Sequence, residues 1–277
     1  MIEFIIFAIL QGLFEWLPIS SSGQVMLVST EGFGITDAQA FSLAIWLHFG
    51  TALAVLVRFR KEYLGIFKSF LPNKFQVEKS DIIKRNWLII ATIGTALTAL
   101  PLYFFIKGVF KGIQGDISTL IISGLLIITG IILLKTQKLF GNKKINDISD
   151  DIFQKDSFIS GLTQGTSILP GISRSAVTIS TILIEGYDQE SALKLSFLMS
   201  VPAVIASIGA DIFFGEGSVF GTLDTLTIII STLVSFIVGY FTMELLLRFA
   251  RKVKFGYFCI VYGIVAFTII LPFLIMS

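Results

Sequence analysis

The chain has 277 residues, of which 54% are hydrophobic and only 14% are charged. Soluble domains carry roughly 25% charged residues, so this composition excludes an ordinary water-soluble globular protein. The net charge of +2 gives no reason to expect nucleic acid as a partner, and a single cysteine excludes internal disulfides and cysteine-based metal sites. The sequence therefore predicts an all-α polytopic membrane protein that forms one integral membrane domain over residues 1–277.

Six segments are apolar over about 20 residues, the length that crosses roughly 30 Å of hydrocarbon. In chain order the predicted transmembrane helices are 38–57, 87–106, 117–134, 195–213, 225–247 and 255–276. Lysine and arginine are concentrated in the connections 58–86, 135–157 and 248–254. Because basic loops stay in the cytoplasm, we expect both chain termini on the external side of a cell membrane.

Two other apolar stretches, 1–30 and 158–186, are interrupted by Gly, Pro and Ser residues and are predicted to be re-entrant helical hairpins. The stretch 1–30 is not expected to be a signal peptide, because it carries Glu3 in place of a basic region. The two stretches resemble each other, with QGLFEWLPISSS at 11–22 and QGTSILPGISRS at 164–175.

Each of these interrupted segments is followed by three predicted spans, so the two halves must have opposite orientations in the membrane. We therefore predict inverted repeats at 1–134 and 158–277, joined by a cytoplasmic linker at 135–157. In such folds the interrupted segments meet near mid-membrane and line the binding site.

Arg174 is the most informative residue of the second interrupted segment. An arginine at membrane depth costs at least about 2.5 to 3.5 kcal/mol unless it is paired or faces water, and its planar guanidinium suits bidentate binding of phosphate oxygens. Ser173 and Ser175 flank it, and Ser173 can cap a helix whose first amides also point at an anion. We predict a phosphate-binding site here, with a structural ion pair to a buried acid as the alternative.

Glu15 is the acidic counterpart in the first interrupted segment. A helix over 2–16 places Gln11 and Glu15 four residues apart on one face. Such oxygen ligands suit a divalent cation (Mg²⁺ or Ca²⁺) that bridges phosphate oxygens, and a lone carboxylate can also act as a general base. The alternatives are an interfacial carboxylate or a salt-bridge partner for Arg174.

Hydroxyl groups and one histidine complete the candidate set. The serines that follow Pro18 can either cap a helix or supply a nucleophile; they are Ser20, Ser21 and Ser22. His48, the only histidine, lies within a predicted span. An ionisable group at that depth is a functional candidate, and a neutral histidine bonded to a neighbouring helix is an equal alternative.

The interrupted segments resemble the undecaprenyl-diphosphate phosphatases of the bacitracin-resistance (BacA/UppP) type, and the resemblance covers nearly the whole chain. That family has an (E/Q)xxxE segment that runs into a P-I-S-S-x-G-H loop, and a P-G-x-S-R-S-x-x-T segment. The corresponding sequences here are QGLFE at 11–15, PISSSGQ at 18–24 and PGISRSAVT at 170–178.

This resemblance implies six spans with two re-entrant hairpins and an outward-facing site that hydrolyses a polyprenyl diphosphate to the monophosphate. The product recycles the lipid carrier for cell-wall and peptidoglycan synthesis, and bacitracin competes for the same lipid. The resemblance also implies dependence on a divalent cation and a possible homodimer. The alternative is a transporter or flippase of polyprenyl phosphate or another anionic lipid, for which the inverted repeat is the physical argument.

The resemblance also assigns roles to individual residues. Glu15 and Gln11 match the acidic, metal-binding motif, Ser21 the proposed nucleophile or phosphate ligand, and Arg174 the phosphate-binding arginine. The remaining residues of the two signatures are predicted to bind the substrate phosphate: Ser20, Ser22, Gln24, Gly171, Ser173, Ser175 and Thr178.

One position departs from the family pattern, because Gln24 stands where the family has histidine and cannot take up a proton near neutral pH. His48 stands where family members commonly have glutamine. We therefore consider two hypotheses for the general base. In the first, the two residue types are exchanged across the cavity and His48 is the base. In the second, Glu15 itself is the base.

Overall fold

The computed structural model describes residues 1–17, 19–112, 115–136, 141–145, 150–214, 219, 223–249 and 264. Over these residues the regular structure is helical, and the one β-type contact is an isolated bridge between Lys143 and Tyr187. The helices in chain order are α1 (Ile2–Phe14), α2 (Ser21–Leu27), the π-helix η1 (Val28–Gly32), α3 (Asp37–Arg58), α4 (Arg60–Lys68), α5 (Lys79–Gly112), α6 (Gly115–Thr136), α7 (Asp150–Gly165), the 3₁₀ turn η3 (Thr166–Ile168), α8 (Arg174–Ile184), α9 (Gln189–Phe214) and α11 (Thr225–Phe249).

Four described helices are long and apolar enough to cross a membrane, which identifies the chain as a membrane protein: α3, α5 up to Ile106, α9, and α11 up to Met243. They coincide with the predicted spans 38–57, 87–106, 195–213 and 225–247. Helix α6 covers the predicted span 117–134. The predicted span 255–276 lies outside the described residues except for residue 264.

Several helices begin earlier than the apolar pattern predicts. Helix α5 starts at Lys79, α9 at Gln189, and α7 at Asp150, inside the predicted linker 135–157. Hydropathy marks only the part of a helix that is suited to lipid, whereas the backbone hydrogen bonds continue into water until a cap ends them. The side chain of Asp188 provides such a cap for α9, since its Oδ1 accepts a hydrogen bond from the Ser191 amide at 2.7 Å.

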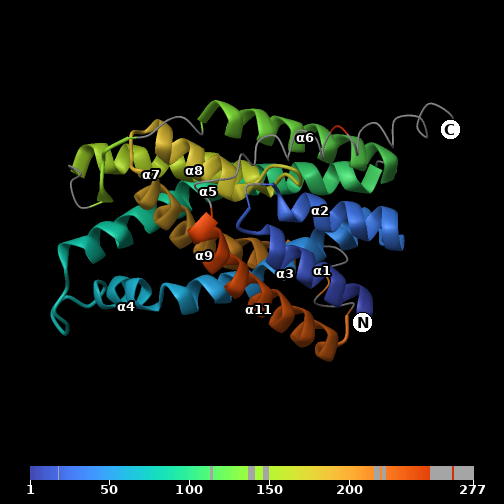
Figure 1. The fold of residues 1–277 in the computed structure, drawn as a ribbon, viewed down its shortest axis with the longest axis horizontal. Helices are drawn as coiled ribbons and strands as arrows, with labels where there is room; N and C mark the ends of the chain where they lie inside the picture. The colour runs from blue at the N-terminus through green and yellow to red at the C-terminus, as the bar shows by residue number, and fades with distance from the viewer. Residues whose placement is uncertain are drawn as a thin grey trace.

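The helices pack against one another along their lengths (Figure 1), and glycines lie at several of these contacts. The most extensive contacts join α5 to α7, and α11 to both α1 and α3. A methyl group on Gly50 of α3 would meet the Thr232 carbonyl oxygen of α11 at 2.5 Å, and one on Gly94 of α5 would meet the Phe158 oxygen of α7 at 2.7 Å. Small residues allow such approach between membrane helices, so these pairs hold the scaffold around the interrupted segments.

The two interrupted segments touch each other at their breaks. The chain breaks between α1 and α2 at Ser20, with φ +57°, and between η3 and α8 at Gly171, with φ +101°. The Gly171 amide donates to Oγ of Ser20 at 3.1 Å, and a methyl group on Gly23 would lie 2.9 Å from the Gly171 nitrogen. This contact brings the residues beside the two breaks, Glu15 and Arg174, into one site.

Candidate active site

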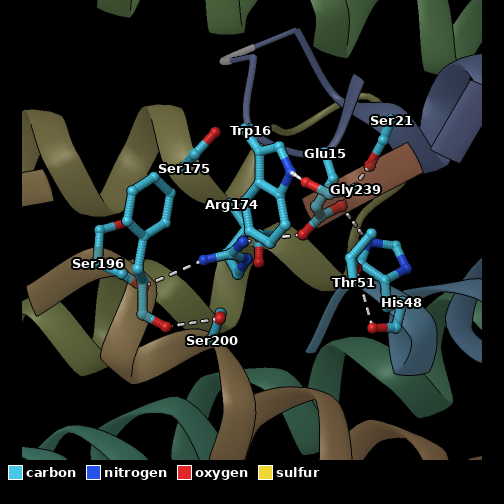
Figure 2. A network of polar contacts seen from close by, with 12 residues as sticks. Glu15, Trp16, Ser21, His48, Thr51, Arg174, Ser175, Ser196, Ser200 and Gly239 are labelled. Atoms are coloured by element: carbon cyan, nitrogen blue, oxygen red, sulfur yellow. Dashed lines mark hydrogen bonds and ion pairs between the residues drawn. The ribbon is translucent and has the colours of Figure 1, made fainter. Parts of the chain in front are cut away.

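The carboxylate of Glu15 is the centre of the site (Figure 2). Its Oε1 accepts a hydrogen bond from Nη2 of Arg174 at 2.8 Å. Its Oε2 lies 3.2 Å from Nε2 of His48, and it accepts hydrogen bonds from Oγ of Ser21 and Nε2 of Gln11, both at 2.7 Å. The side chain of Glu15 is buried, so all four partners act on it in a medium of low dielectric constant.

The groups around Glu15 favour an anionic ligand. The ring of His48 lies between two acceptors, because Nδ1 is 2.5 Å from the Ala44 carbonyl oxygen and Nε2 faces Glu15. An imidazolium satisfies both contacts with N–H donors. With Arg174, the site then holds two cations for one carboxylate, a net positive charge that suits phosphate.

Arg174 is positioned by its own helix, and one of its three guanidinium nitrogens has no hydrogen-bond partner among the described residues. It is the first residue of α8, and Oγ of the N-cap residue Ser173 accepts a hydrogen bond from the Ala176 amide at 3.3 Å. Its Nη1 donates to the Ser196 carbonyl at 3.2 Å, while Nε is buried without a hydrogen-bond partner among the described residues. A phosphate oxygen at the start of α8 would satisfy that donor and face the free amides of the first helical turn.

Ser21 is oriented by the start of α2. Ser20 is the N-cap of this helix and accepts a hydrogen bond from the Gly23 amide at 3.4 Å. Ser21 follows as the first helical residue, and its hydroxyl donates to Glu15. The pair has the arrangement of an oxygen nucleophile beside a general base.

These side chains line a cavity of about 200 Å³ whose far wall is apolar. The apolar wall comes from α3, α5 and α9 and consists of Phe41, Ala44, Ile45, Ala96, Ala99, Leu100, Tyr103, Ala203, Val204, Ala206 and Ala210. The rings of Phe41 and Tyr103 lie 6.0 Å apart, and Phe41 is two turns, about 10 Å, along α3 from His48. The cavity therefore has a polar, positively charged end and an apolar end.

The structure brings together most of the predicted site residues. Seven of them line this cavity: Glu15, Ser20, Ser21, Ser22, His48, Ser173 and Arg174. Gln11 is buried behind Glu15 and reaches the site through its hydrogen bond to that carboxylate. The predicted ion pair between Arg174 and a buried acid is also present, so it belongs to the same site as the predicted phosphate-binding residues.

Four residues that were predicted to bind phosphate do not line the cavity: Gln24, Gly171, Ser175 and Thr178. Their polar groups serve local backbone geometry and helix contacts. Nε2 of Gln24 donates to the Ile19 carbonyl at 3.0 Å, and Oγ1 of Thr178 donates to the Arg174 carbonyl at 2.8 Å. Gly171 supplies the left-handed backbone of the break. These four residues therefore lie outside the lining of this cavity, and direct phosphate contacts by them stay a prediction. The exchange hypothesis also stays a prediction, and of its two residues only His48 lines the cavity.

The described oxygen ligands are too few to hold a divalent cation alone, so they fit one only together with the oxygens of a bound diphosphate. The described residues contain no group of three or more His, Cys, Asp or Glu side chains that could hold a metal. Among the described residues, Glu15 is the one carboxylate that lines the cavity, and the buried Oε1 of its neighbour Gln11 has no hydrogen-bond partner. Mg²⁺ usually keeps several waters and is held by one or two carboxylates together with substrate phosphates.

Sequence reasoning missed three residues of the site. Gln164 and Thr95 line the cavity and are hydrogen-bonded to each other at 3.0 Å, and the carbonyl of Ser196 holds Arg174. The internal repeat aligns Gln164 with Gln11, and this alignment could have indicated Gln164 as a site residue. Thr95 and Ser196 lie in ordinary apolar spans with no pattern that distinguishes them.

Comparisons with known proteins point to one family. The family model described as "Bacitracin resistance protein BacA" matches residues 4–268. The undecaprenyl-diphosphatase of Methanothrix thermoacetophila is 39% identical over 264 residues, which cover 95% of this chain and 94% of the relative. Those of Haloarcula marismortui and Methanococcoides burtonii are 35% and 37% identical, over 94% and 95% of this chain and 93% and 96% of the relatives.

Proposed function

The chain belongs to the family of the bacitracin resistance protein BacA, and from this membership we infer that it is a membrane undecaprenyl-diphosphatase. It hydrolyses the polyprenyl diphosphate to the monophosphate and inorganic phosphate, the activity for which its relatives are named. The observation that carries this conclusion is the meeting of Arg174 and Ser21 on the carboxylate of Glu15, at the polar end of a cavity with an apolar wall.

The residues fit a phosphoryl transfer that depends on positioning and charge neutralisation. Arg174 and the first amides of α8 bind the terminal phosphate, and Oγ of Ser21 attacks its phosphorus while its proton passes to Glu15. The bond to the bridging oxygen breaks, and the lipid monophosphate leaves with that oxygen. Water then attacks the phosphorus of the phosphoserine, and the water oxygen leaves as part of inorganic phosphate. Ser21 regains its proton from Glu15.

The apolar wall accounts for a lipid substrate. Its residues on α5 and α9 recur at helical spacing and are mostly alanine, so each helix presents a shallow apolar surface. The hydrocarbon next to a diphosphate bound at Arg174 can lie against this surface and remove apolar area from water.

We propose that the membrane topology comprises six spans and two re-entrant hairpins arranged as inverted repeats, with the termini and the active site on the external side. Two observations support the re-entrant hairpins. Each of α1, α2, α7 and α8 is shorter than the roughly 20 residues that a span needs, and the breaks of the two segments touch. The orientation is proposed from the basic connections 58–86 and 135–157, because basic loops stay in the cytoplasm.

We also propose that a divalent cation binds together with the substrate. Glu15 and Oε1 of Gln11 would hold it, and substrate phosphate oxygens and water would complete its coordination. Such a cation supplies neutralisation of phosphate charge. From the family resemblance we propose that bacitracin competes for the same lipid diphosphate and that two copies of the chain assemble as a homodimer.

The test is release of inorganic phosphate from polyprenyl diphosphate by the purified protein in detergent, with and without Mg²⁺ or Ca²⁺. We expect turnover by the parent protein and loss of at least about 100-fold in both Glu15→Ala and Arg174→Ala. Absence of phosphate release by folded parent protein would contradict the hydrolase. Movement of the intact lipid across a bilayer would then favour the transporter reading.

A further inference from the structure

Gln164 is a buried side chain at the cavity that the proposed chemistry does not yet use. It lies at the end of α7, is 2% exposed, and is among the residues that line the cavity. Its Oε1 atom is buried and accepts no hydrogen bond within the described part of the chain. A buried polar atom without a partner costs about 1–3 kcal/mol, so a group that fills the cavity is expected to donate to it.

The orientation of this amide is fixed by its neighbours. The single hydroxyl hydrogen of Thr95 is taken up by the carbonyl oxygens of Ala91 and Gly161, which lie 2.8 Å and 3.1 Å from Oγ1. Oγ1 can therefore only accept from Gln164, at 3.0 Å, and the second neighbour, the Met199 carbonyl at 3.5 Å, is also an acceptor. Both contacts require the NH₂ group on that side, which leaves Oε1 as the free end.

The amide is also held firmly, and one of its neighbours lies one helical turn from a residue that contacts Arg174. A methyl group on Gly165 would overlap Oγ1 of Thr98 and lie 2.7 Å from the Thr95 carbonyl oxygen, so the end of α7 is seated directly on α5. The Met199 carbonyl is one turn of α9, a rise of about 4.5 Å, from the Ser196 carbonyl that Arg174 contacts. Gln164 thus approaches the phosphate position from the α5–α9 side.

The chemistry of the substrate indicates which group donates a hydrogen bond to Oε1 of Gln164. An ionised polyprenyl diphosphate carries oxygen acceptors and hydrocarbon, neither of which donates a hydrogen bond. The donor that the reaction does require is water. A glutamine carbonyl that orients the attacking water is an established device in other phosphoryl-transfer enzymes.

We propose that Oε1 of Gln164 holds the water whose oxygen enters inorganic phosphate, which makes Gln164 a positioning residue for hydrolysis. This inference depends on the proposed function. It assigns no proton to Gln164, since the amide accepts a hydrogen bond from the water and does not ionise.

The test compares Gln164→Met, which keeps the volume but removes the acceptor, with the parent protein. We expect kcat for phosphate release to fall roughly 10- to 100-fold, as for a misplaced reactant, with KM for the lipid diphosphate nearly unchanged. With methanol as a competing acceptor, the ratio of methyl phosphate to inorganic phosphate should rise in the variant, because water has lost its preferred position. A purely structural role would lower both products together.

Two further variants complete the test. Gln154→Met makes the same change on the exposed side of α7 and should match the parent. Thr95→Val removes the acceptor that orients the amide and should shift the product ratio in the same direction even if Gln164→Met does not fold. A higher KM with unchanged kcat, or an unchanged product ratio in the folded variants, would overturn the inference. An inactive parent protein would instead refute the proposed function.

Discussion

Nη2 of Arg174 and Oε1 of Glu15 lie 2.8 Å apart although the two residues are 159 positions apart in the chain. Each residue stands beside the break of a different interrupted segment, so the ion pair joins the two halves of the protein. The pair also directs the guanidinium toward the cavity and leaves its Nε unused. A phosphate therefore meets an arginine that is already oriented.

The first prediction concerns the guanidinium group of Arg174. Arg174→Lys keeps the positive charge but replaces a planar fork of five donors with a single ammonium, which cannot serve Glu15, the Ser196 carbonyl and a phosphate together. We expect kcat/KM for phosphate release to fall about 100-fold. The conservative control Arg85→Lys, at the start of α5, should retain parental activity, and an Arg174→Lys activity within threefold of the parent would show that only the charge matters.

The second prediction separates His48 from Gln24. His48→Gln removes one of the two cations beside Glu15, and we expect kcat to fall roughly 100-fold, as for loss of one group that stabilises negative charge in the transition state. Adding Gln24→His should not restore activity, because the side chain at position 24 is directed to the Ile19 carbonyl. Steady-state assays of both single variants and of the double variant measure this, and a rescued double variant would support the exchange of the two residues across the cavity.

The sequence predicted those site residues that are energetically costly to place in a membrane. Arg174, Glu15 and His48 are ionisable groups among apolar residues, and such groups need partners at that depth; the structure makes them partners of one another. The repeat of the Gln-Gly and Ser motifs indicated which segments would meet. Spans were predictable for the same reason, since a helix in lipid must be apolar over its whole length.

Other features could not be predicted from the sequence. The directions of Gln24 and Thr178 depend on which face of a short helix is turned to the cavity, and a helix of seven residues such as α2 has too few turns to show a periodic pattern. Thr95 and Gln164 act through a contact between α5 and α7 that exists only because glycines allow it. The internal repeat indicates Gln164, but local sequence contains no signal for its contact with Thr95.

The third prediction concerns the break before α8. Gly171 has φ +101°, and a Cβ atom there would lie 2.5 Å from the Ile122 carbonyl oxygen. Gly171→Ala should therefore destabilise the protein by about 1–3 kcal/mol and misplace Arg174, so that both the melting temperature and phosphate release fall. Gly124→Ala on α6 is the matched control, because no described residue lies within 4 Å of the added methyl group, and equal melting temperatures for the two variants would contradict the strain.

The fourth prediction concerns pH and two neighbouring acids, Glu185 at the C-terminal end of α8 and Asp156 on α7. Oε2 of Glu185 accepts a hydrogen bond from Ser160 at 3.2 Å, and Asp156 accepts one from Tyr187 at 3.0 Å. Burial and the neighbouring Asp156 carboxylate raise the pKa of Glu185 from an ordinary value of 4.5 to about 8. Between these two values the folded protein holds a proton that the unfolded chain has lost.

Stability should therefore decrease as the pH rises from about 4.5 to about 8 and become independent of this group above that range. Glu185→Gln, which stays uncharged, should raise the melting temperature at pH 8 by roughly 2–4 °C, the effect of about 1 kcal/mol in a chain of this size, and should have little effect at pH 5. Thermal unfolding in detergent at pH 5 and pH 8 measures the difference. The exposed Glu190→Gln is the control and should show neither change, whereas an equal effect of Glu185→Gln at both pH values would mean that Glu185 is ionised throughout.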